Sequence, residues 1–138
     1  MRQMTSQASP DSSRPYRVLV VEDERLNSRL FRTLLEREGY VVSEASSVKT
    51  AIERLTEQTP DLALVDLRIP GGGGLAVLQH IRQTEHLRSM PVVAVTGEGE
   101  ERELLAAGFD GFFGKPIDVR VFASGLQNFL KNGRNPNA

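Results

Sequence analysis

The sequence has 138 residues, of which 39% are hydrophobic, and its 17 basic and 18 acidic residues leave a formal net charge of −1. This length and apolar content favour one domain around a single core. The balanced charge gives no general attraction to nucleic acid, and the absence of cysteine excludes disulfides and thiolate metal sites. Because no apolar run is long enough for a membrane span or a secretory signal, we expect a cytoplasmic protein.

Composition divides the chain into three parts. Residues 1–15 are polar and lack periodicity, so we expect a disordered tail there. The expected domain occupies residues 16–131, and a short C-terminal tail occupies residues 132–138. We therefore expect a stand-alone domain, with no output domain after it.

The first half of the domain alternates short apolar runs with segments of helical periodicity. Arg17–Val21 is β-branched and nearly continuous, which is typical of a strand buried on both faces. Apolar residues then recur at helical spacing up to Gly39, which predicts a helix closed by a glycine cap. Tyr40–Ala45 is the second predicted strand. Val48–Leu55 marks a second helix, which should end before Pro60.

The second half of the domain continues this alternation. Its expected elements, in chain order, are a strand at Asp61–Asp66, a helix at Leu75–Ile81, a strand at Pro91–Thr96, a short helix at Glu100–Ala107, a strand at Gly111–Gly114 and a helix at Val119–Leu130. Such alternation implies parallel strands joined by right-handed crossovers, with helices on both faces of the sheet. The predicted fold class is therefore α/β with a doubly wound sheet.

Polar residues stand where the predicted strands end. Glu22 and Asp23 follow the first strand, Asp66 ends the third, Thr96 ends the fourth, and Lys115 follows the fifth. Because ligands of such sheets bind beyond the carboxyl ends of the strands, we expect these side chains to converge. Neighbouring carboxylates repel one another unless a cation neutralises them, and oxygen ligands without His or Cys suit Mg²⁺.

The same residues could transfer a phosphoryl group. A carboxylate such as Asp66 can act as the nucleophile, while Lys115 and Thr96 hold phosphoryl oxygens. Taken singly, each residue has a plainer interpretation: Asp23 as a helix cap, Lys115 as a solvated charge and Thr96 as a turn residue. The joint pattern over four strand ends favours the phosphoryl-transfer site.

Four segments, VLVVEDE, DLALVDLRIPGGGGL, PVVAVTG and AAGFDGFFGKP, resemble in this order the receiver domain of two-component response regulators. The resemblance covers residues 16–131 and implies a flavodoxin-like, five-stranded parallel sheet of order 2-1-3-4-5. It also implies that Asp66 is the phosphoacceptor, that Asp23 binds Mg²⁺ directly and that Glu22 acts on the ion through water.

Further roles follow from the same resemblance. It implies that the backbone carbonyl of Arg68 completes the magnesium coordination and that Thr96 and Lys115 bind phosphoryl oxygens. Phe112 would be the switch aromatic, and the Lys115–Pro116 peptide would be cis. The resemblance implies a signalling protein rather than an enzyme, although one able to catalyse its own phosphorylation from small acyl phosphates and its own dephosphorylation.

The implied partners are a sensor histidine kinase or a histidine phosphotransfer protein, and an unidentified downstream protein. No nucleic acid, membrane or small-molecule ligand is expected. The sequence leaves open whether the protein is a terminal effector or passes its phosphoryl group onward.

The sequence departs from the family pattern in several places. Gly71–Gly74 lacks the usual polar residue, which predicts a more mobile loop, and Phe112 has no hydroxyl for a partner to bind. The stretch Thr96–Gly108 is about one helical turn shorter than usual and is rich in glutamate. It is either a solvated acidic helix start or a sign that the usual output face is remodelled. Arg68 and Glu98 lie just beyond site residues, and we expect them to pair and limit water access to the acyl phosphate.

Three other functions were weighed. Gly71, Gly73 and Ala76 match a dinucleotide-binding spacing, but the glycines come several residues after the strand. An aspartyl-phosphate phosphatase of the dehalogenase type would need a second acid where Arg68 stands. A degenerate receiver that only binds proteins is disfavoured, because all five site residue types are present.

Overall fold

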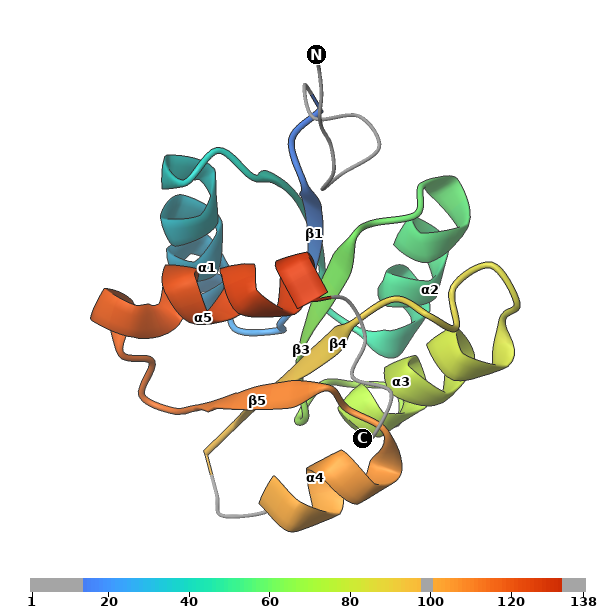
Figure 1. Ribbon diagram of the computed structural model, residues 1–138. Helices are drawn as coiled ribbons and strands as arrows, with labels where there is room; N and C mark the ends of the chain where they lie inside the picture. The colour runs from blue at the N-terminus through green and yellow to red at the C-terminus, as the bar shows by residue number, and fades with distance from the viewer. Residues whose placement is uncertain (1–13, 98–100, 133–138) are drawn as a thin grey trace.

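The structure is a computed structural model that describes residues 14–97 and 101–132. Strands and helices alternate along the chain (Figure 1). In order they are β1 (Arg17–Val21), α1 (Arg25–Arg37), β2 (Val41–Ala45), α2 (Val48–Glu57), β3 (Leu62–Asp66), α3 (Gly73–Gln83), β4 (Val92–Thr96), α4 (Glu101–Ala107), β5 (Gly111–Gly114) and α5 (Val119–Asn132). Each predicted element is present, with ends that shift by a few residues at most.

The five strands form one parallel sheet of order β2-β1-β3-β4-β5. Helices α1 and α5 lie on one face, and α2, α3 and α4 on the other (Figure 1). The predicted fold class and strand order are confirmed. The central strands β3 and β4 are buried throughout because helices cover both of their faces, which explains their continuous apolar sequences.

Alternate residues of the strands supply two apolar cores. On β1, Val18 and Val20 pack towards α1 and α5, whereas Leu19 and Val21 pack towards α2 and α3. The core beneath α1 and α5 contains the rings of Phe31 and Phe122, whose centroids lie 5.5 Å apart with the ring planes tilted by 33°. Packing in the two cores fixes the position of each strand along its own axis, and therefore where each strand ends.

Local sequence explains how individual helices begin and end. Ser47 forms a capping box with Thr50 at the start of α2, because each residue's side chain accepts the other's backbone N–H at 3.1 Å. Helix α1 is followed by Gly39, whose φ of 91° lies in the region that favours glycine. The predicted glycine cap is thus confirmed.

A buried ion pair ties the far end of the sheet together. The Arg82 guanidinium on α3 donates to the carbonyl oxygens of Met90 and Gly108, at 2.7 and 3.0 Å, and to Asp110 Oδ2 at 2.8 Å. The same Asp110 oxygen accepts the N–H of Val92 at 2.8 Å. These bonds join α3, the start of β4 and the turn before β5. Nothing in the sequence pattern pointed to this link.

Several expectations concern parts of the chain outside this description. Glu98 and almost all of both expected tails, 1–13 and 133–138, lie outside the described residues. The Lys115–Pro116 peptide is cis, as the resemblance implied. Among the described helices, none combines the length and apolar character that a bilayer crossing requires.

Candidate functional site

The parallel register brings the predicted site residues to one edge of the sheet. Val21 pairs with Val65, so Glu22 and Asp66 leave adjacent strands at the same level. Thr96 pairs with Gly114 on the neighbouring strand, which places Lys115 directly after it. Residues distant in sequence therefore meet where β1, β3, β4 and β5 end.

Three carboxylates gather at this edge. Glu22, Asp23 and Asp66 each offer an oxygen within 4.8 Å of the others; Glu22 and Asp66 are buried, whereas Asp23 is exposed. Glu22 Oε2 accepts the N–H of Glu24 at 3.0 Å, but the buried Oε1 has no hydrogen-bond partner. A buried acceptor without a donor, beside two further carboxylates, fits a hard divalent cation such as Mg²⁺.

The surroundings of Glu22 change its pKa. Burial, and then the nearby Asp66 carboxylate, raise the pKa of Glu22 from 4.5 to about 7. The Glu24 backbone N–H and the Lys115 charge oppose this shift without cancelling it. Without a cation, Glu22 therefore keeps its proton to a higher pH than an ordinary glutamate does.

Asp66 is held by one donor on each oxygen. Lys115 Nζ lies 2.5 Å from Asp66 Oδ2, and the backbone N–H of Arg68 donates to Oδ1 at 2.8 Å. Although burial alone would lower it, the pKa of Lys115 is raised by its hydrogen bond and charge interaction with Asp66. The carboxylate is 4% exposed, so its orientation is fixed while one side faces a cavity.

A cavity of about 240 Å³ opens over this carboxylate. Its lining comes from the ends of β3 and β4 and from the residue after β5: Asp66, Leu67, Arg68, Val95, Thr96, Gly97 and Lys115. The nucleophile, hydroxyl and ammonium predicted from the sequence thus border one space. A phosphoryl group could enter it in contact with all three side chains.

Two of the remaining predicted residues lie less centrally. Phe112 on β5 is partly buried and packs against the core shared by α2, α3 and α4. It is opposite Ala94, two positions before Thr96 on the neighbouring strand. The Arg68 side chain is exposed at the cavity, but its expected partner Glu98 falls outside the described residues.

A family model named the response regulator receiver domain matches residues 18–127. The polar-differentiation response regulator DivK of Brucella ovis is 36% identical over 116 residues, which cover 82% of this chain and 94% of that protein. The chain belongs to the response regulator receiver family. This receiver domain therefore has a role in two-component signalling, and the dinucleotide-binding and phosphatase interpretations lose their support.

Solved structures of other receiver domains agree with this assignment. The receiver domain of the sensor histidine kinase PA1611 from Pseudomonas aeruginosa, solved with a magnesium ion in its active-site cleft, is 28% identical with a TM-score of 0.77. The superposition covers 85% of this chain and 98% of the PA1611 receiver domain. The chemotaxis regulator CheY4 of Vibrio cholerae, 22% identical with a TM-score of 0.79 over 83% of this chain and 98% of that one, shares the fold.

Gly74 was missed as a functional position by the sequence reasoning, which treated the glycine run only as a mobile loop. A Cβ on Gly74 would lie 2.7 Å from the backbone oxygen of Asp66 and 2.9 Å from a methyl group of Val65. The start of α3 therefore approaches the end of β3 too closely for any side chain at this position. The only signal in the sequence was that a glycine run follows the strand.

Replacing Gly74 by alanine should destabilise this receiver domain by about 1–3 kcal/mol, because the new methyl group meets backbone that cannot move aside cheaply. Gly114→Ala is the matched control, since a Cβ there would meet nothing within 4 Å. Urea unfolding of both variants measures the effect. Equal stabilities for the two variants would show that α3 can shift away from Asp66.

Replacing Glu22 by glutamine should stabilise the metal-free receiver domain at neutral and alkaline pH. A carboxyl group whose folded pKa is raised from 4.5 to about 7 makes the free energy of unfolding fall as pH rises through that interval. The variant should lack this fall and gain on the order of 1–3 kcal/mol above pH 7. Thermal unfolding with a chelator from pH 4 to 9 gives the measurement; parallel profiles for the two proteins would contradict it.

Proposed function

We propose that this receiver domain accepts a phosphoryl group from a phosphohistidine onto Asp66, with Mg²⁺ as its cofactor. The observation that carries the proposal is the environment of Asp66: a buried carboxylate with Lys115 at 2.5 Å, two more carboxylates within 4.8 Å and a cavity in front of it. An aspartate with a purely structural role would need the ion pair with Lys115. It would not need Glu22 beside it, with a buried oxygen that has no hydrogen-bond partner.

The carboxylates supply the expected magnesium ligands. Asp23 and Asp66 would bind the ion directly together with the Arg68 carbonyl, and Glu22 would act through a bound water. Magnesium retains several waters and needs few protein ligands, which leaves a position for a phosphoryl oxygen. When bound, the ion neutralises negative charge on the carboxylates and the phosphoryl group.

The chain's own groups account for the remaining chemistry. An Asp66 oxygen forms the bond to phosphorus as the phosphorus–nitrogen bond of phosphohistidine breaks, and the bonding electrons return to the leaving imidazole nitrogen. Lys115 then pairs with a phosphoryl oxygen in place of the aspartate charge. The Thr96 hydroxyl and the Arg68 N–H can donate to the remaining oxygens, which stabilises charge as it spreads in the transition state.

The output follows from the same residues. Movement of the Thr96 hydroxyl towards the phosphoryl group would free space for Phe112, and the domain would shift between two pre-existing conformations. We propose a cytoplasmic protein that receives its phosphoryl group from a histidine kinase or phosphotransfer protein and signals through protein contacts. Arg68, exposed at the cavity, would restrict access of water to the acyl phosphate.

The proposal is tested by incubating the purified protein with acetyl phosphate and Mg²⁺, followed by intact-mass spectrometry. We expect a gain of one phosphoryl group that disappears when a chelator replaces Mg²⁺, and borohydride trapping should locate it on Asp66. A label on another residue, or no label under conditions where the domain is folded, would reject the proposal. A generic phosphomonoester is the negative control, because no acyl or phosphoramidate bond is available in it.

A further inference from the structure

A second and larger cavity lies beside the phosphoacceptor site. It measures about 660 Å³ and lies between α1 and α2, beyond the ends of β1 and β2. Its volume is in the range of pockets that enclose small-molecule ligands, roughly 300–1,000 Å³. The sequence reasoning expected no such ligand, so the chemistry of the lining decides what the cavity could hold.

The lining is polar and rich in guanidinium groups. Helix α1 contributes Arg25, Arg29 and Arg32, and α2 contributes Arg54. Hydroxyl side chains and the acids Glu22, Asp23 and Glu44 line the rest, with Ala45 as the one apolar residue. Such a surface suits a polar anion far better than an apolar molecule. We refer to it as the arginine pocket.

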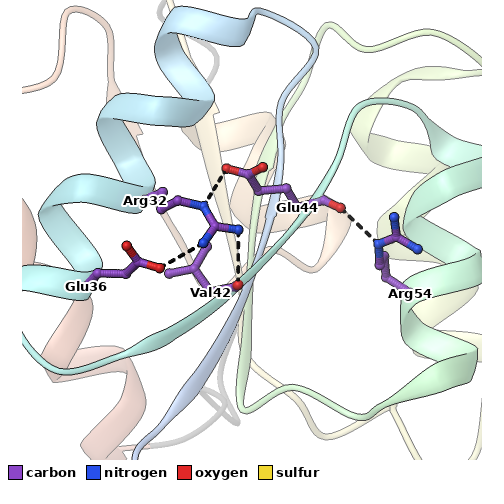
Figure 2. Close-up of polar contacts among 5 residues, drawn as sticks. All are labelled: Arg32, Glu36, Val42, Glu44 and Arg54. Atoms are coloured by element: carbon purple, nitrogen blue, oxygen red, sulfur yellow. Dashed lines mark hydrogen bonds and ion pairs between the residues drawn. The ribbon is translucent and has the colours of Figure 1, made fainter.

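Two of the arginines are held in place by strand β2, as Figure 2 shows. Arg32 Nε donates to the Glu44 carboxylate at 2.9 Å, and its Nη1 donates to Glu36 at 2.8 Å. From the other helix, Arg54 Nε donates to the Glu44 backbone oxygen at 3.1 Å. Glu44 therefore fixes a guanidinium on each side of the strand, which gives the pocket a preorganised wall.

The other two arginines of the pocket, Arg25 and Arg29, are exposed. Within residues 14–97 and 101–132, the side chains of Arg25 and Arg29 make no ion pair or hydrogen bond. They stand one helical turn apart on the face that also carries Arg32, and like charges at this spacing destabilise a helix. They also occupy the beginning of α1, where the helix dipole disfavours cations; the N-cap is Glu24, but the first turn of the helix holds no acidic residue.

The charges of the pocket therefore do not balance once its internal pairs are removed. Glu44 is paired with Arg32, and Glu22 is buried with one oxygen bonded to the Glu24 N–H. Among the acids that line the pocket, this leaves the exposed Asp23 together with Arg25 and Arg29. This arrangement destabilises the helix and leaves the guanidinium groups of Arg25 and Arg29 at a cavity. An anionic ligand would offset that cost.

We propose that the arginine pocket binds a small anion that carries two or more phosphate groups. Arg25 and Arg29 would each bind a phosphate through the planar guanidinium fork, with Arg32 and Arg54 as the fixed wall. The pocket's volume accommodates a nucleoside diphosphate as well as inorganic pyrophosphate. This proposal goes beyond the phosphoacceptor function and does not depend on it.

The test is isothermal titration calorimetry of the whole protein with ADP and with pyrophosphate, in metal-free buffer at constant ionic strength. We expect saturable binding of one ligand per chain. The Arg25→Ala, Arg29→Ala double variant should bind at least about tenfold more weakly, since each loses a charge-assisted contact. The matched control is Arg37→Ala, Arg102→Ala, which removes the same charge from exposed positions outside the pocket and should bind normally.

The remaining outcomes are equally decisive. Comparable affinity for both ligands supports recognition of the phosphates, whereas tighter binding of ADP supports a nucleotide; adenosine alone should not bind. Should the alanine variant fold poorly, the Arg25→Lys, Arg29→Lys variant keeps the charge but loses the fork, and weakened binding supports the proposal. Equal weakening in the control, an unchanged affinity in the lysine and alanine variants, or binding of duplex DNA alone would overturn it.

Discussion

Replacing Asp66 by asparagine should abolish the gain of a phosphoryl group from acetyl phosphate or from a phosphorylated histidine kinase. An amide is not a nucleophile towards phosphorus under these conditions, and the substitution also removes one of the three carboxylates that would hold Mg²⁺. The asparagine oxygen can still accept the Arg68 N–H, so the domain should fold. Phosphate-affinity gel electrophoresis after a fixed incubation provides the measurement.

Two further variants make this prediction specific. Lys115→Ala keeps the nucleophile but removes the ammonium at 2.5 Å, and should slow phosphorylation by about 100-fold or more. Asp118→Asn, at an exposed carboxylate paired only with its neighbour Arg120, should leave the rate unchanged. If the Asp66→Asn protein gains a phosphoryl group to the same extent as wild type, another residue must accept it.

Replacing Arg82 by alanine should lower the free energy of unfolding by about 3–5 kcal/mol, because it leaves the Asp110 carboxylate buried without its cation. The Asp110 side chain is 0% exposed and the Arg82 side chain 17%, so water offers little compensation. Three backbone carbonyls, those of Arg88, Met90 and Gly108, would also lose the hydrogen bond that this guanidinium donates. Such a loss is a large fraction of the stability of an ordinary domain, about 5–15 kcal/mol.

Urea unfolding measures this effect, and a double-mutant cycle assigns it. Asp110→Asn should cost less than Arg82→Ala, since its amide oxygen can still accept the Val92 N–H. In the Arg82→Ala, Asp110→Asn double variant, much of the loss should be recovered because no unpaired charge stays buried. A stability of Arg82→Ala within about 0.5 kcal/mol of wild type, the range typical of surface substitutions, would show that the link carries little energy.

The sequence was sufficient for the fold because its periodicities are unambiguous. Runs such as Arg17–Val21 alternate with amphipathic segments, and the parallel topology then follows because each helix forms a right-handed crossover between two strands. Placement of the site followed from the same reasoning. Once the strands are parallel, Asp66 and Lys115 must leave the sheet on the same edge, although 49 residues separate them.

What escaped the sequence reasoning depends on packing between elements distant in the chain. The raised pKa of Glu22 results from its burial, which no local pattern encodes. Arg82 reads as an ordinary charge near the end of a helix until Asp110 is placed beside it. The spacing of Arg25, Arg29 and Arg32 places these three residues on one face of α1. The pocket could not be predicted from this spacing, because its second wall is formed by α2.

The proposed phosphoryl-transfer site requires one divalent cation bound among Glu22, Asp23 and Asp66, and anomalous diffraction from crystals soaked in Mn²⁺ would locate it. Manganese accepts the same oxygen ligands as magnesium and scatters anomalously. We predict one strong peak in contact with the Asp23 and Asp66 carboxylates and the Arg68 carbonyl oxygen, lost in crystals of Asp23→Asn. A peak elsewhere, or an occupied site that persists in that variant, would contradict the assignment of this edge of the sheet as the phosphoryl-transfer site.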